Sequence, residues 1–152
     1  MDGTTTRPVE RVSPARPALT VALLASLAVV ALLTLTPEGQ GWSWGSPFAE
    51  ARWYLTGLDS TATMLQLTGN LSLLAVPAAL AVLRRPALGR LGALVAVSSA
   101  VSIGIEAAQW ALPLGRVVSP LDAVLNATGA IAGGLLTAYV HRQSRAIPAR
   151  TT

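Results

Sequence analysis

The sequence predicts an all-α membrane protein, a bundle of four transmembrane helices with an outer loop that carries interfacial aromatic residues. Hydrophobic residues make up 52% of the 152 residues and charged residues only 12%, whereas about 25% of residues are charged in a typical soluble domain. The apolar residues also gather in four long runs. A soluble chain of this size could not bury so much apolar surface, but a lipid bilayer can accept it.

The first apolar run covers 18–36 and carries no charge. At about 1.5 Å per residue, it is about 28 Å long, enough to span a hydrocarbon core of about 30 Å. A signal peptide is the alternative, but the exit from Thr34 to Gly39 lacks a small-x-small cleavage site, which favours an uncleaved helix. The other predicted spans are 66–83, 91–112 and 121–140. Ser119 and Pro120 precede the fourth span as a plausible N-cap and first helical residue.

The remaining segments are polar or rich in helix breakers. Residues 1–17 are expected to form a disordered cytoplasmic tail, 18–140 the transmembrane domain and 141–152 a basic cytoplasmic tail. Residues 37–65 contain several glycines and prolines and are expected to form a loop. Its aromatic residues favour a segment at the level of the lipid headgroups; they are Trp42, Trp44, Phe48, Trp53 and Tyr54.

The arginines predict the orientation. All basic residues are arginine, and every one except Arg52 and Arg116 lies in the two tails or in the loop 84–90. Because cytoplasmic loops collect positive charge, both termini are expected inside the cell. Short arginine clusters between apolar runs indicate topology and argue against nucleic-acid binding.

Polar side chains interrupt three of the predicted spans at one depth. Asn70, Glu106 and Asn126 each lie roughly 6–9 Å inside the outer end of their helix. Polar groups in lipid are costly, so they normally face each other or a wet cavity. Gln109 shares the helix face of Glu106, and Asp122 that of Asn126. We expect Arg116, in the loop above, to pair with Glu106 or Asp122, with Glu106 as the preferred partner.

A purely structural role is the competing interpretation. Interhelical hydrogen bonds and small residues hold membrane helices together, and Asp122 in a first turn also suits the helix dipole. Gly129 and Gly133 predict a close-packing face, which we expected to join the third and fourth spans. Pro77 predicts a kink in the second span.

The same residues resemble a known family. Glu106-x-x-Gln109, then Arg116, then Asp122-x-x-x-Asn126-x-x-Gly129 is similar to the signature of the VanZ-like family, and Asn70 followed by Pro77 resembles an earlier motif of that family. The similarity covers about residues 19–140. It implies a multi-pass protein of the bacterial inner (plasma) membrane, because the namesake is a bacterial protein associated with low-level resistance to the glycopeptide teicoplanin. It also marks the polar site by residue: Asn70, Glu106, Gln109, Arg116, Asp122 and Asn126.

Three functions are compatible with these residues. The first is a non-enzymatic membrane protein that binds an amphiphile, either a membrane lipid, a lipid-tailed glycopeptide or an envelope precursor, in an outer-leaflet polar pocket. The second is an intramembrane enzyme that uses Glu106 as general acid or base. The third is a proton-linked carrier that uses Glu106. The chain has no cysteine, no lysine and one histidine, which weakens the enzyme hypothesis and predicts neither a metal nor a cofactor. The catalytic residues and the oligomeric state stay unassigned.

Overall fold

The computed structural model describes residues 15–146, and most of them are helical. The helices are α1 (Ala15–Leu35), α2 (Pro47–Thr56), α3 (Thr61–Leu73), α4 (Ala75–Arg84), the short 3-10 helix η1 (Pro86–Gly89), α5 (Leu91–Ala111) and α6 (Pro120–Ala146). Two three-residue strands complete the fold, β1 (Trp42–Trp44) and β2 (Arg116–Val118). Four helical segments are long and apolar enough to cross a membrane: α1, α3 with α4, α5, and α6. The predicted fold class is confirmed.

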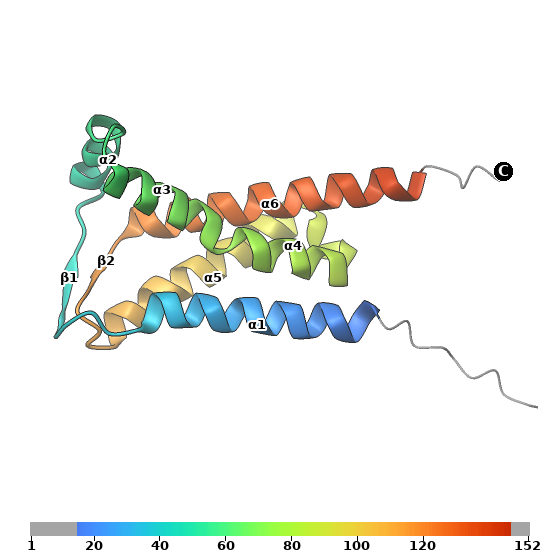
Figure 1. The fold of residues 1–152 in the computed structure, drawn as a ribbon, viewed down its shortest axis with the longest axis horizontal. Helices are drawn as coiled ribbons and strands as arrows, with labels where there is room; N and C mark the ends of the chain where they lie inside the picture. Colours follow the sequence, from blue (N-terminus) through green and yellow to red (C-terminus); the bar gives the residue numbers. More distant parts are fainter. Residues whose placement is uncertain (1–14, 147–152) are drawn as a thin grey trace, which may run out of the picture.

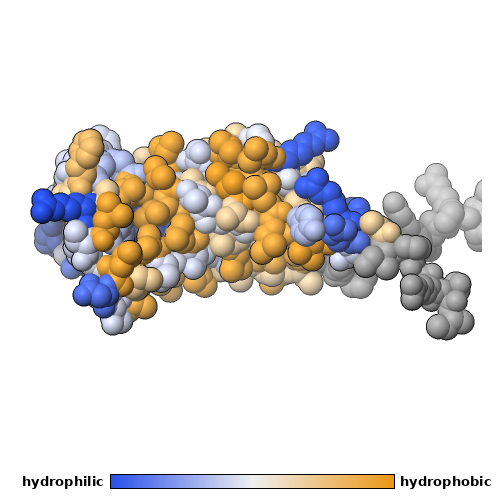
Figure 2. Space-filling view, turned by 90° about the horizontal axis from the view of Figure 1, so that it is seen from above, coloured by the Kyte–Doolittle hydropathy of each residue, from blue (hydrophilic) through white to orange (hydrophobic). Residues whose placement is uncertain are grey.

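The spanning helices lie side by side along the long axis of the molecule (Figure 1). Helix α6 packs against α3, α4 and α5, and α1 packs against α4 and α5. A belt of apolar side chains covers the middle of the molecule, and hydrophilic residues gather at its two ends (Figure 2). This distribution is the one that a hydrocarbon layer between two aqueous phases selects.

The second span is broken in the middle. Helix α3 ends at Leu73 and α4 begins at Ala75, and Leu74 between them has φ −101° and ψ −1°. Pro77 has no N–H to donate to the carbonyl of Leu73, four residues earlier, which removes one helical hydrogen bond at this point. The kink expected from Pro77 therefore takes the form of an interruption one turn before the proline.

The segment 37–65 is more ordered than the expected loop. Strand β1 pairs in parallel with β2, with Trp42 opposite Arg116 and Trp44 opposite Val118. Helix α2 follows, capped by Ser46 with Pro47 in its first turn, and α3 begins at Thr61 rather than Gln66. Capping residues and proline at a first helical position are helix-start signals, and they outweigh the breakers in this segment. Trp42, Trp44, Phe48 and Trp53 are exposed, whereas Tyr54 is buried.

The first and last helices are longer than expected. Helix α1 begins at Ala15, and α6 continues past Val140 to Ala146, so that Arg142 and Arg145 lie on its last turns. Cations there complement the helix dipole, and no glycine or proline lies between Val140 and Ala146 to end the helix. The start of α1 and the end of α6 lie at the same end of the molecule, opposite β1 and β2 (Figure 1). The expected tail arginines Arg7, Arg11 and Arg150 lie outside the described residues.

The glycines of α6 pack against the second span. A Cβ atom on Gly129 would lie 1.7 Å from the carbonyl oxygen of Leu71 in α3, and one on Gly133 would lie 3.1 Å from that of Ala75 in α4. The expectation that this face joins the third and fourth spans is wrong. Gly134, one residue on, is the glycine that meets α5, through Leu94. A rotation of about 100° per residue separates adjacent positions on a helix, so neighbouring glycines face different partners.

Candidate functional site

A polar cavity lies at the end of the bundle nearest the strands. It has a volume of about 470 Å³, and α1, α3, α5, β2 and α6 all contribute to its wall. The structure brings together in this wall all six polar residues that the sequence singled out, namely Asn70, Glu106, Gln109, Arg116, Asp122 and Asn126. Side chains at one depth on three helices therefore do converge on one space. Their functional role stays a prediction.

Asp122 accepts hydrogen bonds from two other elements. It lies in the first turn of α6, where Ser119 acts as the expected cap: the Ser119 hydroxyl accepts from the Asp122 N–H at 3.1 Å. One carboxylate oxygen of Asp122 accepts from the Asn70 amide of α3 at 2.5 Å and from the Tyr54 hydroxyl of α2 at 3.3 Å. Asp122 thus ties helix α2 and the second span to the start of α6.

Glu106 is held by the backbone that precedes α6. Its Oε2 accepts from the Ser119 N–H at 2.8 Å. The Ser119 hydroxyl donates in turn to Glu50 of α2. Glu50, Glu106 and Asp122 therefore all bond to Ser119, and their partners in this network are neutral donors.

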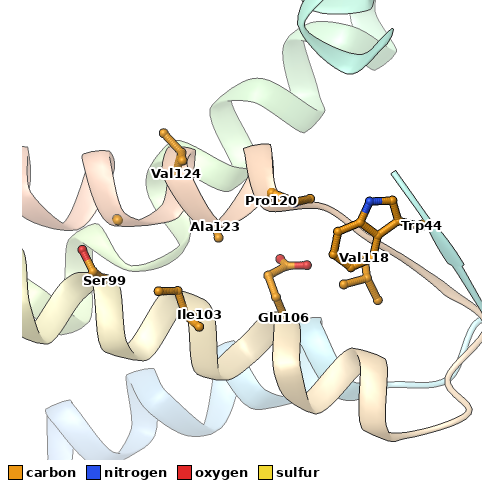
Figure 3. Close-up of a pocket in the computed structure, with 9 residues that line it drawn as sticks. Trp44, Ser99, Ile103, Glu106, Val118, Pro120, Ala123 and Val124 are labelled. Atoms are coloured by element: carbon orange, nitrogen blue, oxygen red, sulfur yellow. The ribbon is translucent and has the colours of Figure 1, made fainter. Parts of the chain in front are cut away.

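An apolar groove lies on the other side of Glu106. It has a volume of about 310 Å³ and runs between α5 and α6 (Figure 3). Ile103, Ala123 and Ala127 line its length, and Trp44 and Val118 line its end next to the strands. Glu106 lines both the groove and the polar cavity. The carboxyl group therefore stands at the boundary between a polar space and an apolar one.

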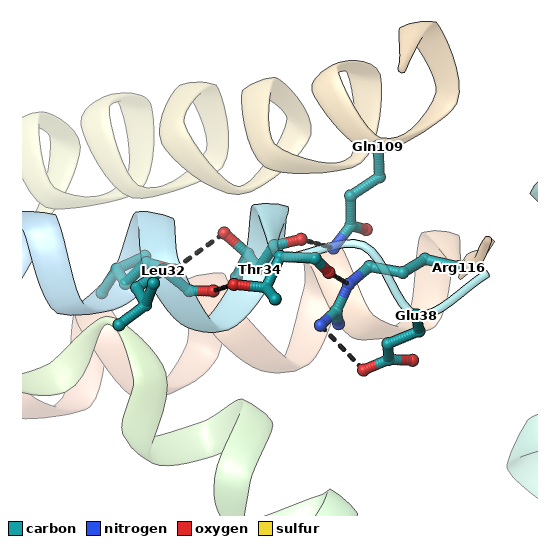
Figure 4. Close-up of polar contacts among 7 residues, drawn as sticks. Leu32, Thr34, Glu38, Gln109 and Arg116 are labelled. Atoms are coloured by element: carbon teal, nitrogen blue, oxygen red, sulfur yellow. Dashed lines mark hydrogen bonds and ion pairs between the residues drawn. The ribbon is translucent and has the colours of Figure 1, made fainter. Parts of the chain in front are cut away.

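Arg116 pairs with neither Glu106 nor Asp122, so the expectation of such a pair is wrong. Its guanidinium forms an ion pair with Glu38 at 2.7 Å, and its Nε donates to the carbonyl of Thr36 at 3.0 Å (Figure 4). The physical reason is the pairing of β2 with β1, which aligns Arg116 with the segment that leaves α1. Within residues 15–146, Arg116 with Glu38 is the one ion pair.

Gln109 and Asn126 differ in what they bond. The Gln109 amide donates to the carbonyl of Thr34 at 2.9 Å and so joins α5 to the end of α1 (Figure 4). Asn126 is only 2% exposed, and its Oδ1 has no hydrogen-bond partner among residues 15–146. Gln109 therefore has a sufficient structural explanation, whereas the acceptor of Asn126 does not.

Tyr54 and Glu50 also belong to the polar site, although the sequence pattern did not identify them as site residues. Burial, followed by the negative charge of Asp122, raises the pKa of Tyr54 from 10.0 to about 12, so the phenol stays a hydrogen-bond donor at a pH where an ordinary tyrosine is ionised. The two residues are four apart on α2 and so share a helix face. This four-residue spacing, after the Ser46-Pro47 helix start, is the feature of the sequence that could have placed Glu50 and Tyr54 together on one helix face.

The acidic residues of the described part of the chain are not clustered in the way that metal ligands are. Across residues 15–146, no group of three or more histidine, aspartate or glutamate side chains is arranged to hold a metal ion. His141, the one histidine of the chain, lies in the last turns of α6, far along that helix from the cavity. The site is better described as a set of acceptors, with one arginine already paired, around a polar space.

Comparison with known proteins places this site within a family. The model of the family described as VanZ/LLP1 matches residues 20–141, which include every residue of the polar cavity. No curated protein and no solved structure matches the chain. A match over most of the chain shows membership, so this four-helix membrane protein belongs to the VanZ/LLP1 family.

Proposed function

We propose that the protein binds an amphiphile in the outer leaflet of the bacterial inner membrane and contributes in this way to glycopeptide resistance. The observation that carries the proposal is the shared position of Glu106. It lines a polar cavity of about 470 Å³ and an apolar groove of about 310 Å³. A molecule with a polar head and an apolar chain needs such a pair of adjoining spaces.

The polar cavity accommodates the head of the amphiphile, and the apolar groove accommodates its hydrocarbon chain. The polar head enters the cavity beside Glu106, Asp122 and Asn126, where it meets acceptors and the amide of Asn70. The chain lies along Ile103, Ala123 and Ala127, whose small or apolar side chains leave room between α5 and α6. In this arrangement the hydrocarbon chain of the amphiphile replaces a membrane lipid at the groove. It exchanges contacts with lipid tails for equally apolar contacts with α5 and α6.

The orientation supports an outer-leaflet site. Arg84, Arg85, Arg142 and Arg145 lie at the end of the bundle away from the cavity. Because arginine-rich ends stay in the cytoplasm, the cavity end faces outward. There it can meet lipids of the outer leaflet and envelope precursors, as well as lipid-tailed glycopeptides such as those to which the namesake of the family confers resistance.

The decisive experiment replaces Glu106 by glutamine. Glu106→Gln keeps the size and the hydrogen-bonding capacity of the side chain but removes its charge, so the fold should persist while the site loses function. Teicoplanin susceptibility is measured together with the abundance of the protein in the membrane. We expect the variant to be as susceptible as a strain without the gene, at normal abundance. Asp59→Asn, an exposed change in the turn before α3, serves as the matched control and should behave like wild type. Full resistance of Glu106→Gln at normal abundance would refute the proposal.

A second experiment tests the groove. Ala127→Trp fills the space between α5 and α6, whereas Thr128→Trp adds the same ring to the exposed face of the same helix. Lipids that copurify with each variant are identified by mass spectrometry. The wild type and Thr128→Trp should retain the same amphiphile, and Ala127→Trp should lose it. Equal retention by both variants would show that the chain does not lie in the groove.

A further inference from the structure

The acceptor of Asn126 marks a position that a donor should fill. This side chain is 2% exposed, Asn126 is one of the residues that line the polar cavity, and its Oδ1 has no hydrogen-bond partner in the part of the chain that the structure describes. A buried acceptor without a partner costs free energy, so such groups are normally satisfied by protein, water or ligand. The cavity is wide enough to admit any of these. A group that enters it to satisfy Asn126 must bring an N–H or O–H.

The charges that line the cavity add a second requirement. Its charged residues are Glu38, Glu106, Arg116 and Asp122. Arg116 is paired with Glu38, whereas Glu106 and Asp122 bond only to neutral donors, namely Ser119, Asn70 and Tyr54. Glu50 of α2 adds a third carboxyl group behind Ser119. Two carboxyl groups of the wall are therefore without a basic partner, and a cation that enters is attracted to them.

We propose, resting on the function proposed above, that the head of the bound amphiphile is a protonated primary amine. An ammonium group has three donors and no acceptor. Its donors match the unpartnered Asn126 Oδ1 and the carboxyl groups of Glu106 and Asp122 that line the same cavity, and its positive charge offsets their negative charge. An anionic head such as a phosphate would bring only acceptors to these groups, and the one basic residue of the wall is already engaged.

The test uses probes that share one chain and differ in the head. The full-length protein is placed in phosphatidylcholine nanodiscs, and binding is measured by calorimetry with empty nanodiscs subtracted. The probes are dodecylamine, dodecyltrimethylammonium, dodecanol and dodecyl phosphate. Dodecylamine should bind with saturation and about tenfold more tightly than the trimethyl compound, which has the charge but no N–H, as expected for one charge-assisted hydrogen bond. Dodecyl phosphate should bind most weakly.

Variants of Asn126 connect the preference to the cavity. Asn126→Leu should weaken dodecylamine binding about tenfold, whereas Thr128→Leu, on the exposed face of α6, should leave it unchanged. Asn126→Asp retains the acceptor and adds a negative charge, so it should bind dodecylamine at least as tightly as wild type, even if Asn126→Leu fails to fold.

Two kinds of failure can be told apart. If no dodecyl probe binds with saturation, amphiphile binding itself is refuted. If the probes bind but dodecyl phosphate or dodecanol equals or exceeds dodecylamine, only the amine assignment is overturned, and water satisfies Asn126 instead. The assignment also fails if Asn126→Asp weakens the binding of dodecylamine.

Discussion

Gly129→Ala should destabilise the bundle, because α3 and α6 touch at this position through their backbones. The new Cβ would lie 1.7 Å from the Leu71 carbonyl oxygen, and ordinary contact begins at 3.4 Å. The two helices must therefore separate by about 1.7 Å or deform, and overpacking of this kind costs about 3 kcal/mol at the upper end of its usual range. The higher helix propensity of alanine relative to glycine offsets about 1 kcal/mol of this cost. The net loss should be about 2 kcal/mol.

Gly104→Ala is the matched control, because it makes the same chemical change in the interior of α5. A Cβ at Gly104 meets no atom within 4 Å, so this variant should gain up to about 1 kcal/mol. Unfolding is followed by circular dichroism and tryptophan fluorescence as dodecyl sulfate is added to protein in mild detergent. Gly133→Ala, with its tightest contact at 3.1 Å, should fall between the two. If Gly129→Ala is as stable as Gly104→Ala, α3 and α6 do not pack through this glycine.

Two further predictions concern Tyr54 and the topology. Because the pKa of Tyr54 is raised from 10.0 to about 12, the unfolded chain loses this proton first, so stability should be retained below pH 10 and fall between pH 10 and 12. Tyr54→Phe should remove that part of the decline, and an unchanged pH profile would contradict the raised pKa. For the topology, an impermeant thiol reagent applied to intact cells should label Ser43→Cys but not Ser144→Cys, both of which are exposed. The opposite labelling pattern would reverse the proposed orientation.

The amino-acid sequence alone determined the positions of the four spans and the depth of the polar residues within them. An apolar run long enough to cross the bilayer is a local property of the chain, because a helix satisfies its backbone hydrogen bonds within the segment. The common depth of Asn70, Glu106 and Asn126 follows from the helix rise in the same way. The sequence predicts the end of α6 less accurately. The end of an apolar run shows where a helix leaves the lipid, but the helix itself can continue beyond that point.

Only the tertiary structure decided which groups meet. Arg116 pairs with Glu38 because β2 lies beside β1, a contact between segments far apart in the chain. Gly129 contacts α3, and Asp122 bonds to Tyr54, because of how α6 is rotated against its neighbours. Periodicity shows which residues share a helix face, but it does not show which helix that face meets. The partner is set by the packing of all the helices together, since each face must find a surface that fits its shape and its hydrogen bonds.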